Sequence, residues 1–155
     1  MDKIKAVESS DGNIHLLFID DDPNLLDASR RLLERLGYIV TTAYNGNEAI
    51  DILKDCHDVF DVVITDYDMP GMNGVELALA AREFLLDTPV ILFSGKIDLK
   101  DETIIWKAGM AAIVKKPCRI KELDNIIRGV INADNVVPMV KETPEYMKLR
   151  GQVKV

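Results

Sequence analysis

The chain has 155 residues, of which 48% are hydrophobic and 29% charged, and its mean hydropathy is +0.03. These values are typical of a globular domain and exclude collagen-like, coiled-coil and largely disordered chains. The formal net charge of −7 has the wrong sign for a surface that follows a phosphate backbone. We therefore expect no nucleic-acid partner and, for the same reason, no anionic membrane surface.

The sequence also indicates a cytoplasmic protein. No apolar run approaches the ~18 residues of a transmembrane helix, and the first residues lack the apolar core of a secretory signal. Cys56 and Cys118 are far apart and match no metal-binding or CxxC spacing. We expect both to be reduced thiols, as is typical of the cytosol.

Short apolar runs predict five strands, in chain order over residues 15–20, 38–43, 61–66, 89–94 and 111–116. Runs that are apolar almost throughout are typical of parallel strands that are covered on both faces. Amphipathic segments separate the strands and follow the last one. The alternation predicts an α/β fold, a doubly wound five-stranded parallel sheet with helices on both faces.

The first predicted helix has clear signals at both ends. Asp22 can cap it, Pro23 stands at its first position, and Gly37 can end it. The other four predicted helices are marked by apolar positions within residues 49–53, 75–85, 104–108 and 120–131.

Outside this pattern the chain is polar or irregular. Residues 1–13 end in the turn signal Asp-Gly-Asn, and periodicity fades after residue 132. We expect a polar N-terminal segment over 1–13, one domain over 14–132, and a tail or the start of a linker over 133–155.

Polar groups stand at the carboxyl ends of four predicted strands. Asp20 and Asp21 follow the first, Asp66 the third, Ser94 the fourth and Lys116 the fifth. Ligands of open parallel sheets bind at this edge. Several carboxylates in one pocket require cations among them, and Lys116 with a hard divalent ion would supply that charge.

Four short motifs lie at these strand ends. They are FIDDDP over residues 18–23, DYDMPGMNG over residues 66–74, SG at residues 94–95 and KP at residues 116–117. In this order and spacing they resemble the receiver domain of two-component response regulators, and the resemblance covers about residues 14–132. It implies a flavodoxin-like strand order, 2-1-3-4-5.

The resemblance implies a phosphoacceptor and a metal site. Asp66 would attack the phosphorus of a phosphohistidine or a small phosphodonor to give an acyl phosphate. Mg²⁺, with Mn²⁺ as an alternative, would be bound by Asp21, Asp66 and the backbone carbonyl of Asp68. Asp20 would act mainly through a metal-bound water. The metal would offset the charge that repels the incoming phosphoryl group.

The resemblance also implies that Lys116 and Ser94 each bind a phosphoryl oxygen. Strand alternation supports the choice of lysine, because Lys116 shares a face with Val114 whereas Lys115 points the other way. The family holds the peptide before the matching proline in the cis form, so we expect a cis bond between Lys116 and Pro117.

The partners implied are a histidine kinase or a histidine phosphotransfer protein. The domain would be no enzyme, except that it catalyses its own phosphorylation and dephosphorylation. We expect the output surface on the fourth helix, fifth strand and fifth helix. A homodimer, if one forms, is expected through the same face. Trp106, Met110 and Ile113 would form an apolar patch there. The other interpretation is that Trp106 folds onto the domain.

Two features depart from the family pattern. Ile113 stands where the family usually has Tyr or Phe, three residues before the site lysine, and an aliphatic side chain cannot make the family's aromatic movement. Asp68 and Lys96 stand two residues after Asp66 and Ser94, at positions that influence phosphoryl arrival and loss in the family. This acid and base could pair across the mouth of the pocket.

Two rival functions were weighed. Asp66-Tyr67-Asp68 matches the DxD pair of haloacid-dehalogenase-like phosphatases, but that motif follows the first strand and its metal-binding acids come later in the chain. A degenerate receiver that only binds proteins is disfavoured because every acceptor-site residue is present. The sequence leaves open the cognate kinase, the output, and whether the chain is a stand-alone regulator or part of a longer protein.

Overall fold

The computed structural model describes residues 13–95 and 99–132. They form a five-stranded parallel sheet with the order β2-β1-β3-β4-β5, which confirms the predicted fold class and strand order. The predicted N-terminal segment, apart from residue 13, and the predicted tail over 133–155 lie outside the described residues. The strands are β1 (His15–Ile19), β2 (Ile39–Ala43), β3 (Val62–Asp66), β4 (Val90–Ser94) and β5 (Ala112–Lys115).

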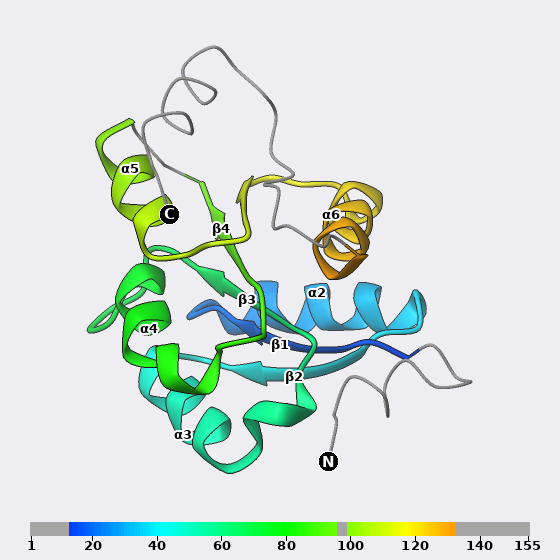
Figure 1. Ribbon diagram of the computed structural model, residues 1–155. Helices are drawn as coiled ribbons and strands as arrows, with labels where there is room; N and C mark the ends of the chain where they lie inside the picture. Colours follow the sequence, from blue (N-terminus) through cyan, green and yellow to red (C-terminus); the bar gives the residue numbers. More distant parts are fainter. Residues whose placement is uncertain (1–12, 96–98, 133–155) are drawn as a thin grey trace.

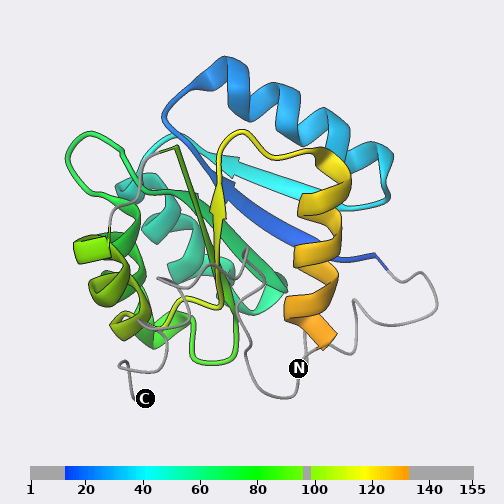
Figure 2. The same ribbon diagram turned by 90° about the horizontal axis from the view of Figure 1, so that it is seen from above.

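Helices cover both faces of the sheet (Figures 1 and 2). One face carries α2 (Pro23–Arg35) and α6 (Ile120–Asn132). The other carries α3 (Gly46–Cys56), α4 (Gly74–Ala80) and α5 (Leu99–Lys107), with two short 3₁₀ helices, η1 (His57–Val59) and η2 (Arg82–Phe84). In the described part of the chain, no helix combines the length and the apolarity needed to cross a bilayer.

Two apolar cores explain why the strands are apolar almost throughout. In β1, Leu17 and Ile19 belong to the core under α3, α4 and α5, whereas Leu16 and Phe18 belong to the core under α2 and α6. Successive side chains of a strand point to opposite faces, so a strand covered on both faces needs apolar residues at nearly every position.

Local signals fix the ends of α2 as the sequence predicts. Asp22 Oδ1 accepts hydrogen bonds from the backbone N–H groups of Asn24 (3.0 Å) and Leu25 (3.3 Å). Pro23 occupies the first helical turn. Gly37 follows the helix with a φ of +98°, a left-handed conformation that favours glycine.

The helix predicted up to Leu85 is shorter than expected. The α-helical part ends at Ala80, and the chain continues through η2. The tighter turn brings Phe84 and Leu85, both half-buried, against the core under α3, α4 and α5. Apolar spacing alone does not distinguish an α-helix from an α-helix that tightens into a 3₁₀ turn.

The predicted apolar surface patch is wrong in this structure. Trp106, Met110 and Ile113 are only 7%, 4% and 6% exposed, and all three belong to the core under α3, α4 and α5. Burying a large indole removes much apolar surface from water, which favours this packing over exposure. The alternative interpretation, that Trp106 folds onto the domain beside Ile113, describes the structure. Ile104, which is 57% exposed, is the large apolar residue at the surface among the described side chains of α5.

Gly74 packs closely against the end of β3. A Cβ atom there would lie 2.4 Å from the carbonyl oxygen of Asp66 and 2.8 Å from Leu92 Cδ1. The Gly74 N–H also donates to the carbonyl of Tyr67 over 2.9 Å. Only a residue without a side chain lets α4 begin this close to the end of β3.

We predict that Gly74→Ala lowers the free energy of unfolding by about 2 kcal/mol, because the added methyl group must displace backbone as well as side-chain atoms. Urea titration followed by circular dichroism measures this loss. Gly95→Ala is the control, since its Cβ would meet nothing closer than Lys116 Cβ at 4.0 Å, and we expect a change below about 1 kcal/mol. Equal losses in the two variants would contradict the steric explanation.

Candidate functional site

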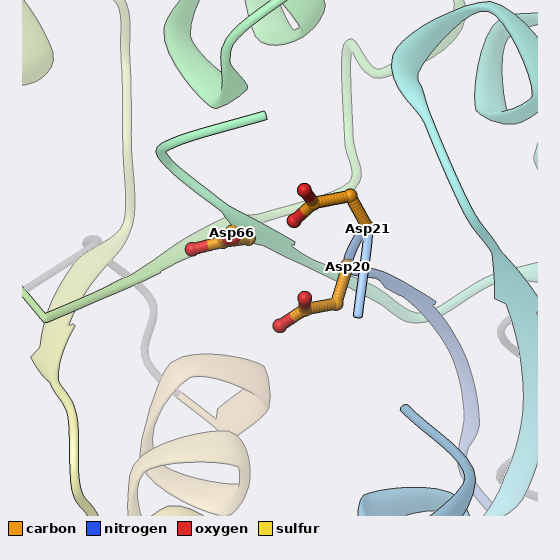
Figure 3. A group of neighbouring side chains, drawn as sticks. All are labelled: Asp20, Asp21 and Asp66. Atoms are coloured by element: carbon orange, nitrogen blue, oxygen red, sulfur yellow. The ribbon is translucent and has the colours of Figure 1, made fainter. Parts of the chain in front are cut away.

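Three carboxylates meet at the carboxyl ends of β1 and β3 (Figure 3). Asp20 and Asp21 follow β1, and Asp66 is the last residue of β3. One oxygen atom from each of the three lies within 4.8 Å of the others. The register explains the meeting, because Ile19 pairs with Thr65 and so places Asp20 next to Asp66. Asp20 and Asp66 are only 1% and 7% exposed, whereas Asp21 is exposed.

Lys116 places its ammonium group between two of these carboxylates. Its Nζ lies 3.0 Å from Asp20 Oδ2 and 3.2 Å from Asp66 Oδ1. Its backbone N–H donates to the carbonyl of Ser94 over 2.7 Å, and the peptide bond to Pro117 is cis, as expected. Lys115 is exposed. The chain thus turns sharply after β5 and directs Lys116 into the site.

The charges in the site shift two pKa values. Burial, followed by the nearby negative charge of Asp20, raises the pKa of Asp66 to about 6, against the opposing effect of Lys116. Burial would lower the pKa of Lys116, but its hydrogen bond to Asp20 and the charges of both carboxylates raise that pKa above its ordinary value. The lysine therefore stays charged at neutral pH.

Asp20 and Asp22 have separate local roles. Asp20 Oδ1 accepts a hydrogen bond from the Asp22 backbone N–H over 2.9 Å, which fixes the carboxylate from the side opposite to Lys116. Asp22 caps α2 and does not belong to the group of three carboxylates. The cap predicted at Asp22 is thus confirmed.

Ser94 is fully buried at the end of β4, directly after Phe93, which pairs in register with Asp66. The polar residues at the carboxyl ends of β1, β3, β4 and β5 therefore lie along one edge of the sheet, as predicted. Asp68 lies on the loop after β3 and lines an open polar cavity of about 520 Å³ together with Asp21, Asn73 and Glu76. Lys96, and with it the predicted pair with Asp68, lies outside the described residues.

Phe93 is a further residue of the site, and no motif in the sequence marks it. The Lys116 ammonium lies over its ring, with Nζ 5.3 Å from the ring centroid. The residue appears in the sequence as one more apolar position of a buried strand. The signal that could have identified it is its place, one residue before Ser94 and level with Asp66 in the sheet.

Comparisons with known proteins agree with this geometry. The family model of the response regulator receiver domain matches residues 16–128. The two-component response regulator ARR10 of Arabidopsis thaliana is 35% identical over 129 residues, which are 83% of this chain and 23% of that protein. The response regulator ORR26 of Oryza sativa subsp. japonica is 36% identical over 119 residues, 76% of this chain and 20% of that protein. The chain thus spans less than a quarter of either relative.

Solved structures resemble the fold over nearly their whole length. A response regulator receiver domain protein from Clostridium thermocellum has a TM-score of 0.72 and 30% identity, covering 77% of this chain and 94% of that one. The chemotaxis protein CheY4 of Vibrio cholerae has a TM-score of 0.71 and 26% identity, covering 76% and 98%. The carboxylate site, the strand order and these matches together show that the chain belongs to the receiver domain family of two-component response regulators.

Proposed function

We propose that Asp66 accepts a phosphoryl group from a histidine kinase or a histidine phosphotransfer protein in a Mg²⁺-dependent reaction. The observation that carries this proposal is the meeting of Asp66 with two further carboxylates and the Lys116 ammonium at one sheet edge. Two buried carboxylates and the half-buried ammonium of Lys116 leave the site short of positive charge. Such a site suits a divalent cation, and the bound cation would in turn allow an anionic phosphoryl group to approach.

The donor set fits Mg²⁺, because carboxylate and carbonyl oxygens are hard ligands. Asp21, Asp66 and the backbone carbonyl of Asp68 would bind the ion, with Asp20 acting through a bound water; Mn²⁺ is an alternative to Mg²⁺. When bound, the ion supplies positive charge that offsets the repulsion between the phosphoryl group and the carboxylates.

The side chains around Asp66 have distinct roles in the proposed transfer. A carboxylate oxygen of Asp66 attacks phosphorus, so that an O–P bond forms while the P–N bond of the phosphohistidine breaks. The bonding electrons pass to the leaving imidazole nitrogen. Lys116, now 3.2 Å from Asp66 Oδ1, would bind one phosphoryl oxygen, and the Ser94 hydroxyl would bind another.

We also propose that the output face consists of α5, β5 and α6, and that a homodimer forms through it. Among the described side chains of this face, Ile104 is the exposed large apolar residue, and Trp106 is buried in the core. A cytoplasmic location is supported by the free thiols of Cys56 and Cys118, and the net charge of −7 disfavours nucleic acid and anionic membranes as partners of this domain.

Two observations separate this proposal from its rivals. The family model that matches the chain is that of the receiver domain. Asp66 also lies on the third strand of the chain, whereas the DxD of haloacid-dehalogenase-like phosphatases follows the first strand. The presence of Asp66, Lys116 and Ser94 at one edge disfavours a degenerate receiver that only binds proteins. A phosphatase would turn over repeatedly, whereas a receiver takes up one equivalent.

We predict that acetyl phosphate with Mg²⁺ adds one phosphoryl group to the chain, and that Asp66→Asn abolishes the addition because the nucleophilic oxygen is lost. Intact-mass measurement counts the groups, and omission of Mg²⁺ should leave the mass unchanged. A second site of equal occupancy, or continuous turnover of the phosphodonor, would show that the assignment is wrong.

We predict that Asp21→Ala weakens Mg²⁺ binding by about tenfold or more, because even the outer partners of metal ligands are commonly worth ~10–100-fold in affinity. Lys116→Ala should bind Mg²⁺ at least as tightly as the unmodified chain, since its ammonium now competes for Asp20 and Asp66. It should nevertheless lose most of the conformational response to phosphorylation. Calorimetric titration with Mg²⁺ tests both variants, and an equal loss of affinity would refute this division of roles.

We predict that Mg²⁺ with beryllium fluoride, a mimic of the phosphorylated state, changes the emission of Trp106, the only tryptophan of the chain. We also expect Ile104→Ala to weaken self-association in sedimentation experiments without preventing phosphorylation. Leu79→Ala is the matched control, because Leu79 is likewise exposed but lies on α4. Unchanged emission, or equal effects of the two variants, would argue against this output face.

A further inference from the structure

Lys116 makes a third contact besides those with Asp20 and Asp66. Its Nζ lies over the Phe93 ring, 5.3 Å from the centroid. This distance is within the ~6 Å at which an ammonium is attracted to the negative face of an aromatic ring. The ring is buried, and the Lys116 side chain is only 23% exposed. The attraction between the two groups is therefore only weakly screened by water.

The Phe93 ring is itself held in place. Phe93 pairs with Asp66 of β3 on one side and with Val114 of β5 on the other, so its backbone lies in the middle of the sheet. Phe18 of β1 packs against it in an edge-to-face arrangement, with centroids 6.2 Å apart and ring planes at 77°. Phe18 is fully buried. The ring is therefore a rigid surface beneath the ammonium.

The two carboxylate contacts of Lys116 differ from the ring contact in one respect. Asp66 is the proposed acceptor, and Asp20 belongs to the proposed metal site, so both carboxylates exchange partners during the proposed reaction. The Phe93 ring takes no part in binding metal or phosphate. It is the one of these three partners that can hold Lys116 in the same place before and after the exchange.

We propose that Phe93 is a positioning residue, whose ring face holds the Lys116 ammonium beside Asp66 while the carboxylates change partners. The contact is independent of any reaction; its role in phosphoryl transfer rests on the function proposed above. A leucine at this position would fill similar space in the core but has no negative face. Lys116 would then be free to turn toward solvent whenever its carboxylate partners are occupied.

A double-mutant cycle on the full chain without metal tests the contact. Phe93→Leu, Lys116→Met and the double variant are unfolded in urea, and their equilibrium constants are compared. We expect Phe93→Leu to raise the unfolding equilibrium constant in both backgrounds. The rise should be about fivefold larger when Lys116 is present than when it is replaced by Met, a difference of about 1 kcal/mol. Phe60→Leu is the control, because Phe60 is a buried ring of the core on the opposite face of the sheet, and it should cost the same in both backgrounds. Equal costs of Phe93→Leu in the two backgrounds would overturn the proposal.

A series of fluorinated phenylalanines at position 93 tests the role in transfer. Successive fluorine atoms weaken the negative ring face at nearly constant size, so a purely structural role would leave the series flat. We expect the rate at which acetyl phosphate with Mg²⁺ labels Asp66 to fall stepwise, by about tenfold across the series. The same series at position 60, in the core on the opposite face, should have no effect. A flat series at position 93 would overturn the positioning role. If the unmodified chain is not labelled at all, the proposed function fails, while the urea cycle still decides whether the contact exists.

Discussion

Asp20 and Asp66 are buried side by side and share the ammonium of Lys116, and the rest of the site depends on this arrangement. A buried carboxylate is costly unless it is paired and hydrogen-bonded. One cation cannot fully compensate two such groups, which agrees with the raised pKa of Asp66. The site is therefore short of positive charge, a condition that the proposed divalent ion would relieve.

The sheet makes this arrangement tolerable because every strand end is fixed by its neighbours. Ile19 pairs with Thr65 and Ser94 with Lys115, so the side chains that follow β1, β3 and β5 have little freedom to separate. Gly74 adds a constraint from the loop side, since α4 begins in contact with the Asp66 carbonyl. Repulsion between the carboxylates is opposed by a backbone that is hydrogen-bonded and closely packed on several sides.

Much of this could be predicted from the sequence, because strand runs and polar strand ends are local patterns. The fold class, the strand order implied by the resemblance, the cap at Asp22 and the cis bond before Pro117 all agree with the structure. The misses concern packing between elements distant in sequence. Nothing local shows that Trp106 turns inward, that the helix after Gly74 tightens at Ala80, or that Phe93 lies beneath Lys116.

The two side chains proposed to bind the phosphoryl group are connected to opposite faces of the sheet. Lys116 lies against Phe93, which belongs to the core under α2 and α6. Ser94, next in the strand, points to the other face, where Trp106 of α5 and Ile113 of β5 belong to the same core. Under the proposed function, a shift of Lys116 would act first on the α2–α6 layer, and a shift of Ser94 would act first on the layer that contains Trp106. The aliphatic Ile113 therefore does not leave this layer without an aromatic side chain at α5, because α5 itself supplies Trp106.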